Sequence, residues 1–238
     1  MFSPAGVKKG PISPHGRPLE LILATLLSFS LPVAAAPDIV KGWHTYDAMG
    51  CMLLKECTEG ITRVKNTRDV ERIFKRDFSA VRKEFDSISK SFDKIGINVY
   101  IADAKYFPHG HRGVYHTVSN HFYLNEAYVY RPNVFVAVVR HEGWYAAQDC
   151  MAGTIDNTLI AIIKPEEVVP QLWQDMATRT YSLMPKAIPW EKEAFWAGHT
   201  EGMTAEALKV CASDTPMWKH YTPTPLTRKW LQENKYIE

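Results

Sequence analysis

Several sequence patterns that would assign this chain to a common enzyme class are missing. There is no G-x-S-x-G nucleophile motif, no glycine-rich phosphate loop and no dinucleotide-binding fingerprint. No internal repeat or low-complexity tract is present either. The apolar and charged fractions, 46% and 23%, are ordinary for a globular protein. With 238 residues the chain is long enough for one large domain or two small ones.

The first part of the chain has the pattern of a secretory signal peptide. Three basic residues precede an apolar run over 19–33, and the small residues Ala34-Ala35-Ala36 follow it. We predict that residues 1–36 are removed and that the protein is exported, secreted or periplasmic; cleavage after Ala35 is the alternative. An uncleaved membrane anchor is less favoured, because the run is short for a bilayer span and is broken by Pro32.

A surplus of basic residues is also missing once this segment is set aside. Three of the 28 Lys and Arg residues and one of the 26 Asp and Glu residues lie in 1–36, which leaves 25 of each sign. The mature protein is therefore formally neutral, and we expect no nucleic-acid partner.

The sequence has only four cysteines, which is an even number. Cys51, Cys57, Cys150 and Cys211 all follow the predicted signal peptide, which favours two disulfides. Three pairings are possible; we favour Cys51–Cys57, which closes a short loop, with Cys150–Cys211. A C-x5-C spacing is not that of a zinc knuckle, and four free thiols are the expectation only in a reducing compartment.

Apolar spacing predicts helices in the first part of the mature chain. One helical pattern covers 47–59. A stronger one begins at Asp69, a candidate N-cap, and ends at Gly96. Its interleaved acidic and basic residues are typical of the solvated face of an amphipathic helix rather than of a binding patch.

A β-rich stretch follows, and the remainder is helical. Residues 97–102 are predicted as a strand, and 114–118 with 121–125 as a hairpin around Ser119-Asn120. Later helices are expected over 132–149, from 165 towards 185, from 189 to 197, over 204–211 and over 227–234.

The segment Val138–Asp149 carries the most informative pattern. In an H-E-x-x-H helix, two histidines four residues apart bind a metal, and the glutamate acts as general base on the metal-bound water. Here His141 and Glu142 fill the first two positions, and Tyr145 stands where the second histidine would be. Taken alone, this pair is more simply a core histidine beside a surface glutamate.

The order of elements around this motif resembles the gluzincin class of zinc metallopeptidases. A strand, a hairpin, the motif helix and a later helix with Glu191-Lys192-Glu193-Ala194 follow one another between residues 97 and 197. In that class the third zinc ligand is a glutamate on a downstream helix, commonly followed by alanine. Glu193 matches this pattern, and Glu191 is the less favoured candidate.

The resemblance implies an α+β, zincin-like fold with a small antiparallel sheet packed on the motif helix. It implies one domain over 37–238, composed of a helical part (37–96), a metallopeptidase-like core (97–200) and a helical extension (201–238). One strand of the hairpin would offer an open edge to an extended peptide.

The same resemblance implies a zinc-dependent hydrolase of peptide or protein substrates. Zn²⁺ would be held by His141, Tyr145 and Glu193, and Glu142 would activate the metal-bound water. The class also places an oxyanion-stabilising group downstream; Tyr181 and His199 are candidates without a distinguishing signal.

Tyr145 leaves three interpretations open. The phenol, whose pKa is normally about 10, ligates zinc weakly, or His199 takes its place. Alternatively the metal is lost, and the fold survives as an exported domain that binds a peptide or another partner. In the third interpretation the sequence is a variant of an active enzyme, since His and Tyr codons differ by one base. A purely structural, disulfide-stabilised helical protein is more distant.

Four other histidines lie close together in the sequence. His109, His111, His116 and His121 flank the glycine-containing loop and the hairpin, and an H-x-H pair can bind metal. Exposed polar residues are common in such segments, so we favour a surface role for them.

Overall fold

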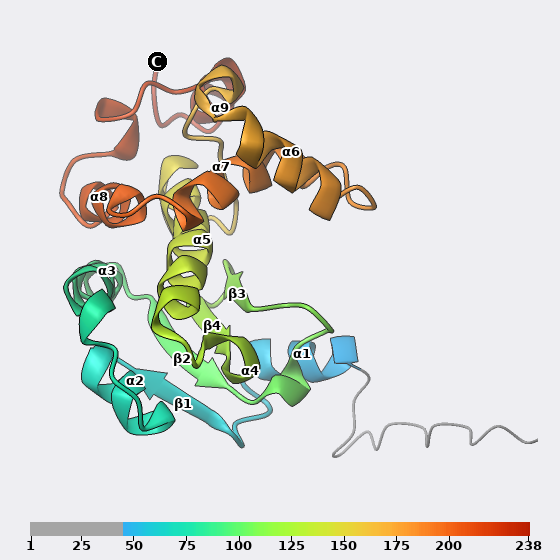
Figure 1. Ribbon diagram of the computed structural model, residues 1–238. Coiled ribbons are helices and arrows are strands. Elements are labelled where there is room, and N and C mark those ends of the chain that lie inside the picture. Colours follow the sequence, from blue (N-terminus) through green and yellow to red (C-terminus); the bar gives the residue numbers. More distant parts are fainter. Residues whose placement is uncertain (1–44) are drawn as a thin grey trace, which may run out of the picture. The chain divides into compact units, whose positions relative to one another are not determined.

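The computed structural model describes residues 45–238 (Figure 1). The predicted signal peptide lies outside these residues. None of the described helices is both long and apolar enough to cross a membrane. The described part is an α+β structure that is mostly helical, which confirms the predicted fold class at that level.

The sheet has four strands, and β2 and β4 at its centre are parallel. The strands are β1 (Ile61–Val64), β2 (Asn98–Ala102), β3 (Gly113–His116) and β4 (His121–Asn125), in the spatial order β1-β2-β4-β3. The β1–β2 and β3–β4 pairs are antiparallel. The predicted hairpin is therefore confirmed. The sheet is mixed, not antiparallel, because the long β2–β3 connection lets β4 insert between β2 and β3.

The N-terminal helices differ from the expected pattern at two points: the first ends at Leu53 rather than near residue 59, and the second is broken. They are α1 (Thr45–Leu53), α2 (Thr67–Phe74) and α3 (Arg82–Lys94). The single helix predicted over 69–96 is broken, because Lys75 adopts a left-handed conformation with φ 51°. The carboxylate of Asp77 then accepts a hydrogen bond of 2.7 Å from the Ser79 amide and opens a new turn.

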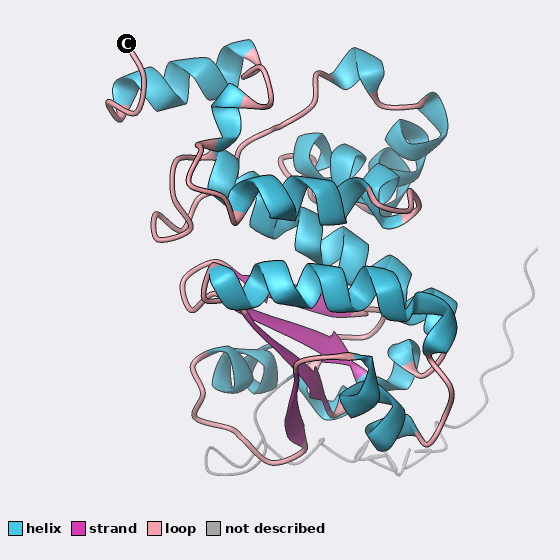
Figure 2. Cartoon of the chain, turned by 90° about the vertical axis from the view of Figure 1, so that its left-hand side faces the viewer, coloured by secondary structure: helices cyan, strands magenta, loops and turns pink. Residues whose placement is uncertain are grey.

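Helix α5 (Pro132–Met151) is the central element and confirms the predicted motif helix. Its 20 residues are largely buried, with Pro132 in the first turn. It packs against β3 and β4 on one side and against α7 and α8 on the other (Figure 1). Figure 2 shows the strands together below a layer of helix, with only helices and loops above it. The largest buried core side chains include Phe85, Phe122, Phe135 and Trp144.

The remaining elements are short and mostly follow the predicted order. The helices are α4 (Glu126–Val129), α6 (Gln171–Thr180), α7 (Ile188–Gly198), α8 (Met203–Cys211) and α9 (Pro225–Glu233). Single 3₁₀ turns lie at Ser79–Val81, Ala104–Tyr106, Glu166–Val168 and Met217–Lys219. Helix α6 begins later than expected because Pro170 separates it from the 3₁₀ turn before it.

Both disulfides join the residues that we favoured from the sequence. Cys51–Cys57 closes the turn after α1, and Cys150–Cys211 ties the end of α5 to the end of α8. The second bond spans 61 positions and the first only six. A disulfide that closes a longer loop removes more conformational entropy from the unfolded chain.

We therefore expect the two disulfides to contribute unequally to stability. By the chain-entropy relation, replacing Cys150 and Cys211 with serine should lower the free energy of unfolding by about 4 kcal/mol, and replacing Cys51 and Cys57 by about 2 kcal/mol. Urea denaturation of both double variants and of the wild type measures this. An equal or larger loss for the Cys51/Cys57 variant would contradict the expectation that the disulfide between α5 and α8 stabilises the protein more.

Candidate site on helices α5 and α7

The side chains of His141 and Tyr145 meet on one face of α5. They lie one helical turn apart, and His141 Nε2 is 3.1 Å from the Tyr145 hydroxyl. Helix α7 crosses α5 closely at this point. A Cβ atom on Gly198 would lie 3.2 Å from the Cβ of His141, so the absence of a side chain there allows the approach.

The carboxylate that α7 presents to this pair belongs to Glu191. Its Oε1 accepts a hydrogen bond of 2.5 Å from the Tyr145 hydroxyl. Its Oε2 lies 3.5 Å from His141 Nε2 and is a buried atom without a hydrogen-bond partner in the described residues. His141, Tyr145 and Glu191 thus converge, and one carboxylate oxygen remains unsatisfied.

Glu193, which the sequence favoured as a ligand, faces a different set of partners. Its carboxylate accepts hydrogen bonds from Trp144 Nε1 at 3.0 Å, from Gln148 Nε2 at 2.7 Å, and from the backbone amides of Ile163 and Lys164. Residues two apart on a helix project in different directions, so Glu191 and Glu193 cannot both face His141. The Glu-Ala pattern selected the residue that anchors α7, and the structure brings Glu191 to the site.

Glu142 lies beneath the edge strand β3. A Cβ atom on Gly113 would come within 2.9 Å of its Cγ, so the strand can pass this close only with glycine at that position. Burial raises the pKa of the Glu142 carboxyl to about 8, and the nearby Glu191 adds to this rise. A hydrogen bond from the backbone at Tyr115 partly offsets this rise, because it lowers the pKa of the Glu142 carboxyl.

The other titratable groups of the site are also shifted towards their neutral forms. Burial lowers the pKa of His141 to about 4, partly opposed by a hydrogen bond to the backbone of Ala194. Burial likewise raises the pKa of Glu191 to about 7. Burial, and then the carboxylates of Glu191 and Glu142, hold the pKa of Tyr145 well above its ordinary value. An imidazole with a free lone pair is the form that a metal requires.

Of the two candidates for an oxyanion-stabilising group, Tyr181 is influenced by the carboxylates of the site. Burial, followed by the charges of Glu191 and Glu142, raises its pKa. His199 instead stacks on Trp173 with ring centres 4.2 Å apart, and its Nδ1 lies 2.8 Å from the carbonyl oxygen of Phe195. No sequence pattern singled out Tyr181, because it lies in the α6–α7 connection.

The converging atoms fit the spacing of metal ligands. Two ligands of a tetrahedral zinc ion, each about 2.0–2.1 Å from it, lie roughly 3.3–3.4 Å apart. The distances from His141 Nε2 to the Tyr145 hydroxyl, 3.1 Å, and to Glu191 Oε2, 3.5 Å, bracket that value. Glu191 Oε1 lies 2.5 Å from the same hydroxyl, too close for both atoms to be ligands, so Oε2 is the candidate ligand atom of Glu191. No three His, Cys, Asp or Glu side chains group in this way within residues 45–238. A metal would therefore need a phenol among its ligands.

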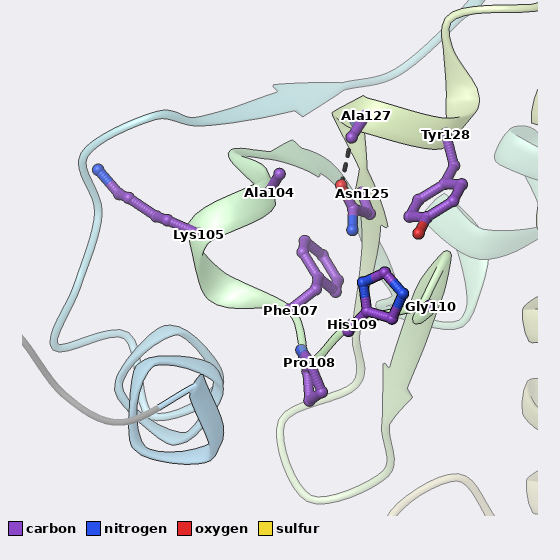
Figure 3. Close-up of a pocket in the computed structure, with 9 residues that line it drawn as sticks. All are labelled: Ala104, Lys105, Phe107, Pro108, His109, Gly110, Asn125, Ala127 and Tyr128. Atoms are coloured by element: carbon purple, nitrogen blue, oxygen red, sulfur yellow. Dashed lines mark hydrogen bonds between the residues drawn. The ribbon is translucent and has the colours of Figure 1, made fainter. Parts of the chain in front are cut away.

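The histidines of the hairpin and its preceding loop lie elsewhere. His116 and His121 are directly opposite each other on β3 and β4. His121 is buried with its Nδ1 3.1 Å from the hydroxyl of Tyr123, and His116 Nδ1 lies 2.7 Å from the Ser119 hydroxyl. His109 lines a separate cavity of about 380 Å³ (Figure 3). None of the residues lining that cavity belongs to the His141 site.

Comparisons of the chain with protein-family models, with curated proteins and with solved structures found no match. The site is therefore interpreted from its own geometry.

The two glutamates of α7 should respond differently to mutation. Glu193→Ala leaves the donors of Trp144 and Gln148 and two backbone amides without their buried acceptor, so we expect a loss of about 3 kcal/mol or more in the free energy of unfolding. Glu191→Ala removes a carboxylate that burial disfavours and leaves one donor, the Tyr145 hydroxyl, without its acceptor, so it should cost less, about 1 kcal/mol. Urea denaturation in the presence of a chelator measures both, and the reverse order would show that Glu191 is the structural anchor.

The stability of the metal-free protein should fall as the pH rises through neutrality. The pKa of Glu142 is raised from 4.5 to about 8, so its contribution to stability is fully present below about 4.5 and is lost as the pH approaches 8. Glu191 acts in the same direction up to about pH 7. The pKa of His141 is lowered, so its opposite contribution changes only between about pH 4 and 6.5.

Between pH 6.5 and 8 the titration of Glu142 therefore determines the difference in pH dependence between wild type and Glu142→Gln. The wild type should lose about 1–2 kcal/mol more than the variant over this interval. Urea denaturation at both pH values, with chelator throughout, gives the comparison. Identical pH dependence would mean that the Glu142 carboxyl is not kept protonated by its surroundings.

Proposed function

We propose that this protein is a zincin-like, zinc-dependent hydrolase of peptide bonds. His141, Tyr145 and Glu191 would hold the metal, with Glu191 in place of Glu193, and Glu142 would be the general base. The observation that supports this most directly is the unsatisfied Oε2 of Glu191, 3.5 Å from His141 Nε2, beside a buried glutamate that immediately follows the histidine. A buried carboxylate oxygen without a donor calls for a cation.

Each residue has a defined task in this proposal. When bound, zinc supplies Lewis-acid chemistry that favours deprotonation of water and stabilises negative charge on a carbonyl oxygen. Glu142 would accept the proton of the attacking water once a bound metal ion, by its positive charge, lowers the raised pKa of this carboxyl towards neutral pH. The Tyr181 hydroxyl, whose pKa is raised by burial and then by the charge of Glu191, would donate a hydrogen bond to the oxyanion.

The edge strand β3 would bind the substrate. It pairs with β4 along one side only, and its Gly113 passes directly over Glu142. An extended peptide that adds to the free side of β3 would lie across the side chains of α5. The chain thus offers a route by which a scissile bond reaches Glu142 and His141.

An exported location accords with the chemistry of the chain. Two disulfides form in the structure, and disulfides persist mainly in oxidising compartments. We therefore propose a secreted or periplasmic protein that acts on peptides or proteins, with residues 1–36 as its signal peptide.

A second function is favoured by one particular contact. The hydrogen bond from Tyr145 to Glu191 partly satisfies the site without a metal. A catalytically inactive domain that binds an extended peptide along β3 would retain this contact and would use the same surface of the strand.

Metal content and activity separate these functions. We expect purified wild type to contain one zinc ion per chain, Glu191→Ala to contain none, and Glu142→Gln to keep its zinc while losing peptidase activity by a factor of at least about 100. Tyr145→His restores a second imidazole and should raise both the affinity for zinc and the activity. Elemental analysis and a generic fluorescent peptide library provide the readouts.

The same experiment can overturn the proposal. If Tyr145→His also lacks zinc, the three side chains do not form a zinc site, and the zincin-like proposal fails. If only the wild type lacks zinc and yet binds library peptides, the inactive domain is the correct alternative.

A further inference from the structure

The connection between α6 and α7 presents large apolar side chains to solvent. Leu183 is 95% exposed, and the neighbouring Met184 is 56% exposed. Among the large exposed apolar residues of the described part of the chain, these two alone are adjacent in the sequence. Single exposed apolar side chains are ordinary on a protein surface, whereas grouped ones mark a site of interaction.

Backbone hydrogen bonds fix the shape of this connection. The Met184 amide donates to the carbonyl oxygen of Tyr181 at 2.8 Å, and the Ala187 amide donates to the carbonyl oxygen of Met184 at 2.9 Å. Pro185, between them, has no amide hydrogen. These pairings lower the cost of moving the connection from water into an apolar medium, which offers no partner to a free amide.

The charged residues next to the apolar pair are basic. Between residues 176 and 190 the only charged side chains are those of Arg179 and Lys186. Both are exposed, and neither forms an ion pair with any of residues 45–238. Of the acidic residues that flank this stretch, Asp175 accepts a hydrogen bond from Gln171 and Glu191 is buried. The surface around the pair is therefore positive.

An apolar pair between two cations matches the chemistry of an anionic bilayer surface. Apolar side chains enter the boundary between headgroups and acyl chains, while neighbouring Lys and Arg side chains stay among the headgroups. Nucleic acid would bind the cations but leave Leu183 and Met184 in water. A second copy of the chain would bring like charges together, which is unfavourable.

We propose that residues 182–186 insert Leu183 and Met184 into the surface of an anionic lipid membrane, with Arg179 and Lys186 bound to headgroup phosphates. The attachment is peripheral and reversible, because the contact is small. Helix α7 begins at Ile188, directly after this connection, so the membrane would lie beside the candidate site on α5 and α7. Attachment itself requires neither a metal nor the proposed hydrolase.

Cosedimentation with lipid vesicles tests this proposal. The protein is used in its exported form, without residues 1–36, because the apolar run over 19–33 would itself bind lipid. We expect binding to vesicles of phosphatidylglycerol and phosphatidylcholine in equal parts, and much weaker binding to phosphatidylcholine alone. Added salt should weaken the binding to the anionic vesicles.

Two double variants separate the apolar contribution from the electrostatic one. Replacing both Leu183 and Met184 with serine should lower the partition coefficient at least about tenfold. Arg179→Gln combined with Lys186→Gln should lower it about 25-fold, or about fivefold for each charge.

Exposed residues elsewhere provide matched controls. Val118→Ser removes an apolar side chain that is 69% exposed in the hairpin. Lys83→Gln combined with Lys90→Gln removes two exposed charges from α3. Both control variants should bind the vesicles as the wild type does, and circular dichroism establishes that every variant is folded.

Several outcomes would overturn the proposal. One is equal binding of the wild type and the Leu183/Met184 variant; another is an equal loss in the α3 variant, which would show that only net charge matters. If vesicles are not bound and the wild type forms a dimer that the Leu183/Met184 variant does not, the connection is a surface for a second copy instead. A chelator is present throughout, so the result is independent of zinc content and peptidase activity.

Discussion

The hydrogen bonds to the buried carboxylate of Glu193 determine how the candidate site is assembled. They join α7 to α5 through Trp144 and Gln148, and to the loop at Ile163 and Lys164 through backbone amides. With this rotation of α7 fixed, Glu191 must face His141. The Glu193 carboxylate thus acts on the site without touching it, because it selects which glutamate the site receives.

The elements that cross α5 closely bury the titratable groups of the site, which makes the charged forms of these groups less stable. Gly113 and Gly198 let a strand and a helix approach Glu142 and His141 from two sides, which reduces the access of water to both side chains. Burial then disfavours every charged form, so that the imidazole loses its proton readily and the carboxyls retain theirs. In the proposed metal site, binding of a positive ion would release those protons.

Local sequence patterns predicted the helices and strands of this fold better than they predicted the contacts between them. Pro132 and the apolar spacing indicated α5, the hairpin followed from its β-rich runs, and the disulfide pairing followed from loop length and position. The parallel β2–β4 pair and the choice of Glu191 over Glu193 depend on tertiary packing, and a match to Glu-Ala carries no information about helix rotation. Tyr181 was only one of two unsupported candidates, because nothing local marks a residue in an irregular connection.

The replacement of histidine by Tyr145 is best understood together with its neighbours. A site that had merely lost its ion would gain stability from apolar substitutions at His141, Glu142 and Glu191, since each of these polar groups is costly to bury. All three remain polar, and the phenol adds a donor that reaches Glu191. This bond satisfies one oxygen of Glu191, and the second oxygen has no hydrogen-bond partner in the described residues. The proposed site therefore keeps an available carboxylate oxygen beside His141 even with a phenol in place of the second histidine.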